Sequence, residues 1–86
     1  MHESHSPAVT VYWRPGCPFC SMLAADLARV GLEYQTRNIW EDPEAAAFVR
    51  SVARGNETVP TVRIGEAVLV APSTHAVLAA HASANE

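Results

Sequence analysis

The chain has 86 residues, enough for one domain and too few for a second hydrophobic core. The net charge of −3, with six arginines scattered along the sequence, argues against the basic patch that nucleic-acid binding normally needs. No apolar run approaches the ~20 residues that span a bilayer, and residues 1–7 lack the features of a secretory signal. We therefore expect a cytoplasmic domain that binds neither nucleic acid nor membrane.

A strand is predicted near the N-terminus, after a polar tail. Residues 1–7 are polar and show no apolar period, so we expect them to be flexible. Residues 8–13 are β-branched and aromatic, as in a buried strand. The sequence Arg14-Pro15-Gly16 that follows is a turn signal.

A helix is predicted from Pro18 to Val30. Pro18 suits the first turn because its missing N–H would have no partner there, and Gly31 supplies a left-handed stop. The apolar side chains that recur at helical spacing, and that we expect to face the core, are Met22, Leu23, Leu27 and Val30.

The middle of the chain predicts a strand over residues 33–39 and a second helix. Asp42 is a favoured helix cap, and Pro43 suits the first helical position. The apolar face expected for this helix consists of Ala45, Phe48, Val49 and Val52.

The C-terminal part predicts two short strands and a last helix. The strands Thr61–Ile64 and Ala67–Val70 flank a hairpin signal. Ser73 can cap the last helix, whose residues Val77 and Leu78 are expected to face inward, with a frayed end over residues 83–86. The resulting order, βαβαββα, predicts one α/β domain over residues 8–82.

The two cysteines, Cys17 and Cys20, are the strongest chemical signal. A bridge between positions three apart closes a small loop and adds little stability, so chemistry is the better reason for the pair. A helix start favours the thiolate, which is the nucleophile. We expect Cys17 to point toward solvent and attack, and Cys20 to lie deeper and resolve. Arg14 is a candidate for stabilising the thiolate.

Two alternatives for the cysteine pair have less support. A zinc site would need a second Cys pair or a His-x-x-x-His spacing, and the sequence has neither. A structural disulfide is unusual in a cytoplasmic chain. We therefore expect no metal and no bound cofactor. The segment Thr58-Val59-Pro60 precedes a strand, where Pro60 is either cis or an ordinary loop proline.

The segments around both motifs resemble the glutaredoxin family of the thioredoxin superfamily. Residues 12–20 resemble its active-site segment, and residues 58–62 are similar to its cis-proline segment. The resemblance implies a four-stranded mixed sheet flanked by three helices, with Pro60 cis against the Cys17 sulfur. It also implies strand-like pairing of the Val59 backbone with the substrate. The site-shaping candidates are Arg14, Pro18 and Pro60, and the thiol- or substrate-binding candidates are Phe19, Thr58, Val59, Ser73 and Thr74.

One departure bears on the small thiol that the protein uses. Glutathione-dependent glutaredoxins carry a Gly-Gly-x-Asp type segment, which residues 69–74 lack, and Phe19 has no hydroxyl. Residues 38–62 and Pro72-Ser73 are instead similar to actinobacterial mycoredoxins, which implies mycothiol as the co-substrate. Ser73 is either a thiol contact or only a helix cap. Trp40 is expected in the core or at the rim of the site rather than as a binding residue.

The resulting hypothesis is a monomeric enzyme that reduces protein–mycothiol mixed disulfides, protein disulfides, or both. The runner-up is a glutaredoxin-like electron donor, for example to ribonucleotide reductase, that is itself reduced by thioredoxin reductase. A glutathione-dependent glutaredoxin is a further alternative. An iron–sulfur binding module is disfavoured because Pro18 stiffens the residue after the first cysteine.

Overall fold

Four strands and three helices follow one another in the computed structural model, which describes residues 7–84. The order β2-β1-β3-β4 has β1 parallel to β2 and antiparallel to β3, which is antiparallel to β4. This mixed sheet confirms the predicted βαβαββα order. The elements are β1 (Val9–Trp13), α1 (Pro18–Val30), β2 (Gln35–Asn38), α2 (Pro43–Val52), β3 (Thr61–Ile64), β4 (Ala67–Val70) and α3 (Thr74–Ala84).

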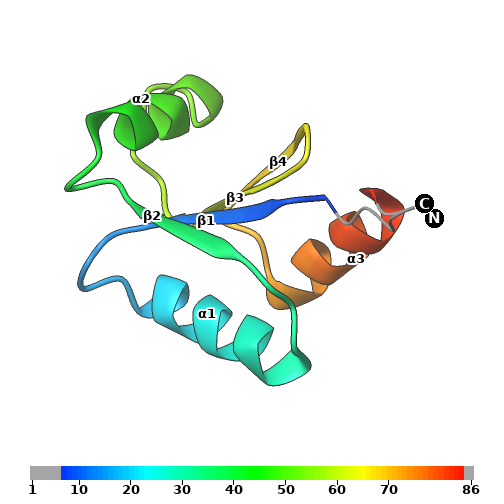
Figure 1. Cartoon of the computed structure of the whole chain (residues 1–86). Helices are drawn as coiled ribbons and strands as arrows, with labels where there is room; N and C mark the ends of the chain where they lie inside the picture. The colour runs from blue at the N-terminus through cyan, green and yellow to red at the C-terminus, as the bar shows by residue number, and fades with distance from the viewer. Residues whose placement is uncertain (1–6, 85–86) are drawn as a thin grey trace.

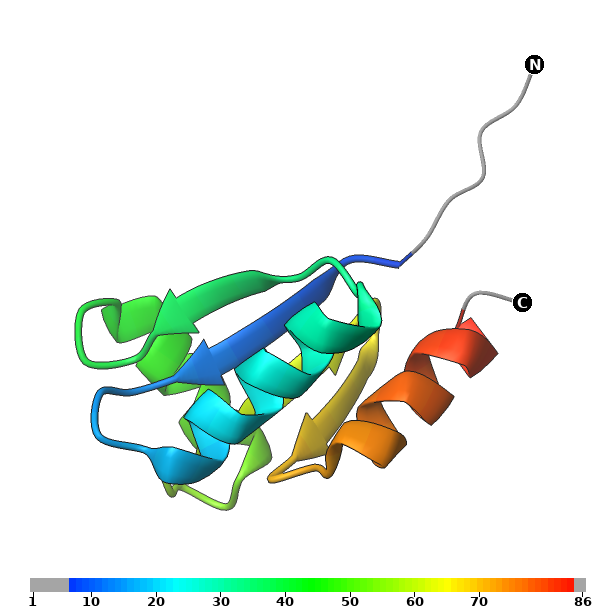
Figure 2. The same cartoon turned by 90° about the horizontal axis from the view of Figure 1, so that it is seen from below.

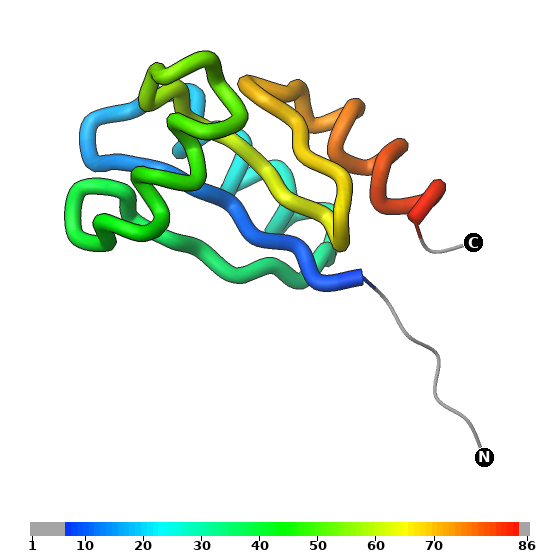
Figure 3. Tube along the Cα trace, turned by 90° about the horizontal axis from the view of Figure 1, so that it is seen from above, coloured from blue at the N-terminus to red at the C-terminus, as the bar shows by residue number. Residues whose placement is uncertain are grey.

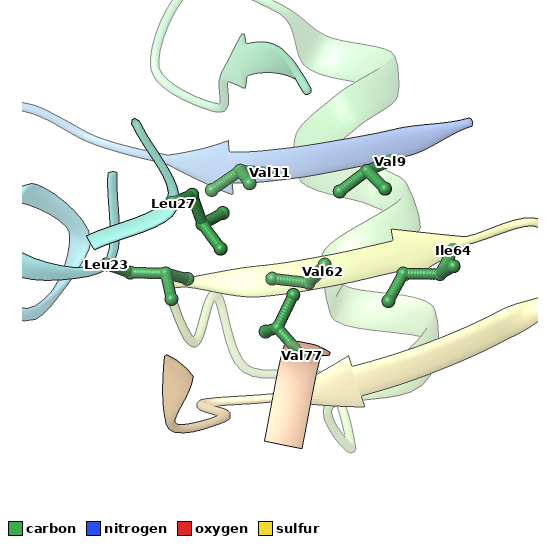
Figure 4. Packing of buried hydrophobic residues seen from close by; sticks show 7 residues of the cluster. All are labelled: Val9, Val11, Leu23, Leu27, Val62, Ile64 and Val77. Atoms are coloured by element: carbon green, nitrogen blue, oxygen red, sulfur yellow. The ribbon is translucent and has the colours of Figure 1, made fainter. Parts of the chain in front are cut away.

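Helices cover both faces of the sheet, with α1 and α3 on one face and α2 on the other (Figure 1). The larger core cluster lies under α1 and α3, where alternate side chains of β1 and β3 meet both helices (Figure 4). Burying one such side chain contributes about 1.5–3 kcal/mol. The buried members are Val9, Val11, Leu23, Leu27, Val62, Ile64 and Val77.

The smaller core cluster lies under α2. Tyr12 points to this face, and its ring packs on that of Phe48 with centroids 5.0 Å apart. Asp42 caps α2, as predicted, because its Oδ1 accepts from the backbone N–H groups of Glu44 and Ala45 at 3.1 Å. The cap fixes the start of α2 close behind β2.

Helix α1 begins and ends where the sequence predicts, but two of its four expected core residues are exposed. Met22 is 60% exposed and Val30 is 50% exposed, so that prediction was wrong for both. Leu23 and Leu27, one turn apart, define the buried face, and Met22 lies far from it around the helix. Val30 is the last helical residue and lies outside the core cluster.

Other boundaries shift by a few residues. The second strand is shorter than predicted, and it forms a largely exposed edge of the sheet. Helix α3 continues to Ala84, so residues 83–84, predicted to fray, are helical. Residues 1–6 and 85–86 lie outside the described residues, and the domain limits of 8 and 82 stay a prediction. Among residues 7–84, no helix has the length and apolar character that a bilayer crossing requires.

Candidate active site

The two cysteines form a disulfide at the N-terminus of α1. The turn after β1 leads directly into this end of the helix (Figure 2). Cys17 is the N-cap of α1, and its Sγ accepts from the backbone N–H of Cys20 at 3.2 Å. Pro18 occupies the first helical position, as predicted. The Cys17 sulfur therefore lies where the free N–H groups of the helix converge, which favours negative charge on it.

The expected contrast in depth between the cysteines is almost absent. Cys17 is 6% exposed and Cys20 is 4% exposed, so the prediction that the Cys17 sulfur faces solvent was wrong for this oxidised state. The disulfide holds both sulfurs together, and the Val59 carbonyl oxygen lies 3.8 Å from the Cys17 Sγ. Cys17 is therefore shielded from one side by the loop before β3.

That loop carries the cis peptide bond between Val59 and Pro60. Pro60 is buried, and its carbonyl oxygen accepts from the backbone N–H of Ala71, at 2.8 Å. The carbonyl of Thr58 accepts from the hydroxyl of buried Thr61, also at 2.8 Å. These bonds fix both ends of the cis-proline turn beside the disulfide, although the turn and the disulfide are about 40 residues apart in sequence. Figure 3 shows the two segments side by side.

The segment between β4 and α3 carries two further candidates, and both hydroxyls have structural partners. Ser73 Oγ accepts from the backbone N–H of Ala76 at 3.0 Å, so Ser73 is a helix cap. Thr74 Oγ1 donates to Asp26 Oδ2 at 2.8 Å and ties α3 to α1. Neither hydroxyl is hydrogen-bonded to the disulfide. Ala71 has a left-handed φ of 53°, a conformation that favours glycine.

Arg14 lies over the ring of Trp40, a residue expected in the core or at the rim of the site. Its guanidinium carbon lies 5.7 Å from the ring centroid of Trp40, and its Nη1 donates to the Pro15 carbonyl at 3.0 Å. It makes no hydrogen bond to either sulfur. Trp40 is 63% exposed, so it is not a core residue. The sequence holds a signal for this exposure, because Trp40 lies in a polar turn just before the Asp42 cap.

Exposed apolar side chains also stand on the first turns of α1. Phe19 is 70% exposed and follows Cys17 by two residues. Met22 lies one turn further on the same side of the helix, since the two residues are three apart. A substrate that reaches the disulfide therefore meets apolar surface on this side.

Of two cavities that described residues line near α1, the smaller reaches Cys20. A cavity of about 830 Å³ lies between the C-terminal end of α1 and the starts of β1 and β2, away from both cysteines. A second, of about 270 Å³, is lined by Trp13, Cys20 and Thr36 among others. Neither cysteine lines the larger cavity, whereas Cys20 lines the smaller one.

Charges near the site are paired at the end of β2. The backbone N–H of Ala45, followed by the Arg37 guanidinium, holds the pKa of Asp42 below its usual value, and Asp42 in turn raises the pKa of Arg37. The Arg37 Nε donates to Asp42 Oδ2 at 2.7 Å. Within residues 7–84, no three His, Cys, Asp or Glu side chains gather as a metal site would require.

A mixed four-stranded sheet with a Cys-Pro-Phe-Cys disulfide at a helix start, facing a cis-proline turn, defines a thioredoxin-fold thiol–disulfide oxidoreductase. A family model described as Glutaredoxin matches residues 9–69. The chain therefore belongs to the glutaredoxin family.

The similar proteins support this assignment. Mycoredoxin 1 of Corynebacterium glutamicum is 41% identical over 58 residues, which are 67% of this chain and 71% of that protein. A glutaredoxin-class protein of Mycobacterium tuberculosis is 37% identical over 73 residues, 84% of this chain and 87% of its own length. The solution structure of glutaredoxin from Brucella melitensis is 30% identical, with a TM-score of 0.70, and covers 91% of this chain and 84% of its own.

Proposed function

We propose that the protein reduces mixed disulfides between proteins and mycothiol, and protein disulfides directly, through Cys17 and Cys20. The observation that carries the proposal is the disulfide at the N-terminus of α1, with the Val59 carbonyl 3.8 Å from the Cys17 sulfur. We also propose that the protein is cytoplasmic and monomeric.

The reaction begins with both cysteines reduced. The Cys17 thiolate attacks the mycothiol sulfur of a protein–mycothiol disulfide, a Cys17–mycothiol disulfide forms, and the protein leaves as a thiolate that takes up a proton. A second mycothiol thiolate then attacks the mycothiol sulfur on Cys17, which releases oxidised mycothiol and the Cys17 thiolate. Alternatively, the Cys20 thiolate attacks the Cys17 sulfur, expels mycothiol as a thiolate and forms the disulfide observed here.

The surrounding residues have proposed roles in this reaction. The helix start and the charge of Arg14 favour the Cys17 thiolate, while Pro18 and Pro60 shape the site. Thr58, Val59 and Phe19 contact the substrate, with the Val59 backbone pairing with its peptide groups. Because the hydroxyls of Ser73 and Thr74 are already engaged, these two residues contact the thiol through their main chain.

Mycothiol is preferred to glutathione because residues 69–74 offer no Gly pair and no Asp for a γ-glutamyl carboxylate. Mycothiol has a sugar–inositol body and no γ-glutamate, so it does not need that contact. The similarity to Mycoredoxin 1 supports the same preference.

The test is a side-by-side assay of three electron donors with the same mixed-disulfide peptide: mycothiol with its reductase, glutathione with its reductase, and thioredoxin reductase. We expect turnover with mycothiol. Efficient turnover with glutathione alone would overturn the choice of thiol. Direct reduction of the oxidised protein by thioredoxin reductase, without mycothiol activity, would favour an electron carrier of the thioredoxin type.

A further inference from the structure

Trp40 is a large, exposed aromatic side chain on a rigid turn beside the active site. Its backbone N–H donates to Asn38 Oδ1 at 2.9 Å, and the preceding Ile39 N–H donates to the Trp13 carbonyl at the end of β1, also at 2.9 Å. Ile39 itself is buried. The turn is therefore fixed to the sheet, while 63% of the Trp40 surface remains in solvent. No part of the core requires a tryptophan here.

Arg14 connects this ring to the reacting cysteine. Its guanidinium lies over the Trp40 ring. Its Nη1 also lies next to Gly16: a Cβ atom added to that glycine would be 3.8 Å from it, an ordinary van der Waals contact. Gly16 directly precedes Cys17. The ring, the guanidinium and the turn before Cys17 thus form one continuous surface, which we call the Trp40–Arg14 platform.

We propose that the Trp40–Arg14 platform is the binding subsite for the polyhydroxylated, uncharged body of the thiol co-substrate, and that Trp40 determines its specificity. This rests on the proposed function, because it concerns the body attached to the sulfur that Cys17 attacks. A sugar or cyclitol ring has an apolar face of C–H groups, which stacks on an aromatic ring, and a rim of hydroxyls, which accept from a guanidinium.

The composition of the platform favours this occupant over a charged one. Of the two acidic residues that follow Trp40, Asp42 is paired with Arg37, whereas the side chain of Glu41 is exposed. The platform therefore has a carboxylate near it, which disfavours an anionic ligand, and the Arg14 guanidinium in it, which disfavours a cationic one. Arg14 already donates to a neutral carbonyl oxygen, that of Pro15, and needs no anionic ligand for that bond. A partly solvated guanidinium, with its five N–H groups, suits neutral hydroxyl and carbonyl acceptors.

The kinetic test compares two mixed disulfides of one peptide, with mycothiol and with N-acetylcysteine, which lacks the sugar–inositol body. In Trp40→Ala, we expect the ratio of kcat/KM for mycothiol over N-acetylcysteine to fall about three- to tenfold. Trp40→Phe should recover part of the ratio. Val30→Ala, which removes a similarly exposed apolar side chain far along α1, should leave the ratio unchanged.

The binding test uses the wild-type protein and the cysteine-free sugar–inositol compound. The protein has two tryptophans, so Trp13→Phe and Trp40→Phe assign the two indole N–H signals in an NMR spectrum. We expect a saturable shift of the Trp40 signal and none of the Trp13 signal. This measurement does not depend on a variant that alters folding.

Each outcome decides the proposal. An unchanged ratio in Trp40→Ala, or no shift of the Trp40 signal, overturns it. An equal loss with both disulfides overturns it too and assigns Trp40 to the peptide instead. If the wild-type protein fails with mycothiol in the donor assay, the proposed function and this inference fall together. If the wild-type protein turns over with mycothiol, but the Trp40→Ala ratio and the Trp40 NMR signal do not change, only this inference is wrong.

Discussion

The backbone N–H of Cys20 donates to the Sγ of Cys17 at 3.2 Å, so the first cysteine of the pair is also the N-cap of α1. The residue proposed to attack the substrate thus satisfies one of the free donors at the helix start. Reactivity and helix stability therefore depend on one atom, and substitutions at Cys17 can separate the two.

Cys17→Ser and Cys17→Ala should both abolish thiol transfer, but only the alanine variant should lose the cap. Serine accepts the same hydrogen bond, whereas alanine cannot, so we expect Cys17→Ala to be less stable than Cys17→Ser by about 1 kcal/mol. Thermal unfolding of the two variants measures the difference, and both lack the disulfide, which makes them matched. Equal stability would contradict the capping role.

Cys20→Ser should separate the two routes of the proposed reaction. The Cys17 thiolate can still exchange with a mixed disulfide and be regenerated by a second small thiol, so we expect that activity to persist. Reduction of a protein disulfide should be lost, because no second thiol closes the intramolecular bridge. The two activities are measured with a mixed-disulfide peptide and with a disulfide protein. Ser21→Ala is the neighbouring control, and equal loss of both activities in Cys20→Ser would defeat the assignment of roles.

Thr74→Val should destabilise the protein by about 1 kcal/mol, because the hydroxyl that donates to Asp26 at 2.8 Å is removed. We expect KM for the small thiol to change little, since the proposed contact of Thr74 is through its main chain. Denaturant unfolding and steady-state kinetics measure the two quantities. Thr10→Val, at a half-buried position of β1 that lines neither cavity, is the control. Unchanged stability with a raised KM would show that the hydroxyl serves the thiol instead.

Asp42→Asn should lower the thermal stability of the protein at neutral pH, and this difference from the wild type should disappear in acid. Asparagine keeps the cap of α2 but not the charge paired with Arg37. The pKa of Asp42 is held below its usual value in the folded protein, so its carboxylate contributes stability that is fully present above the pKa of the unfolded chain. That contribution is lost as the pH falls through the lower folded pKa. We expect the Tm difference between wild type and Asp42→Asn to shrink below about pH 4. A difference independent of pH would contradict the charge effect.

The sequence alone was sufficient to predict the order of the elements and the location of the reactive pair. Local signals are strong at those points: Pro18 and Gly31 mark the two ends of α1, and Asp42 followed by Pro43 marks the start of α2. These residues act within one turn of the chain, so their effect can be read without knowing the fold. The glutaredoxin resemblance also depended on two short segments.

The tertiary structure decided what each side chain faces. Met22 and Val30 are apolar residues of the kind that form cores, but both are exposed, because exposure depends on which face of α1 meets the sheet. Trp40 meets Arg14, and Val59 meets Cys17, only because the turns after β1, after β2 and before β3 converge at one end of the sheet. Contacts between residues tens of positions apart are set by strand order and register, which no local pattern encodes. Local propensity therefore placed the cysteines at a helix start, and packing of distant segments built the surface around them.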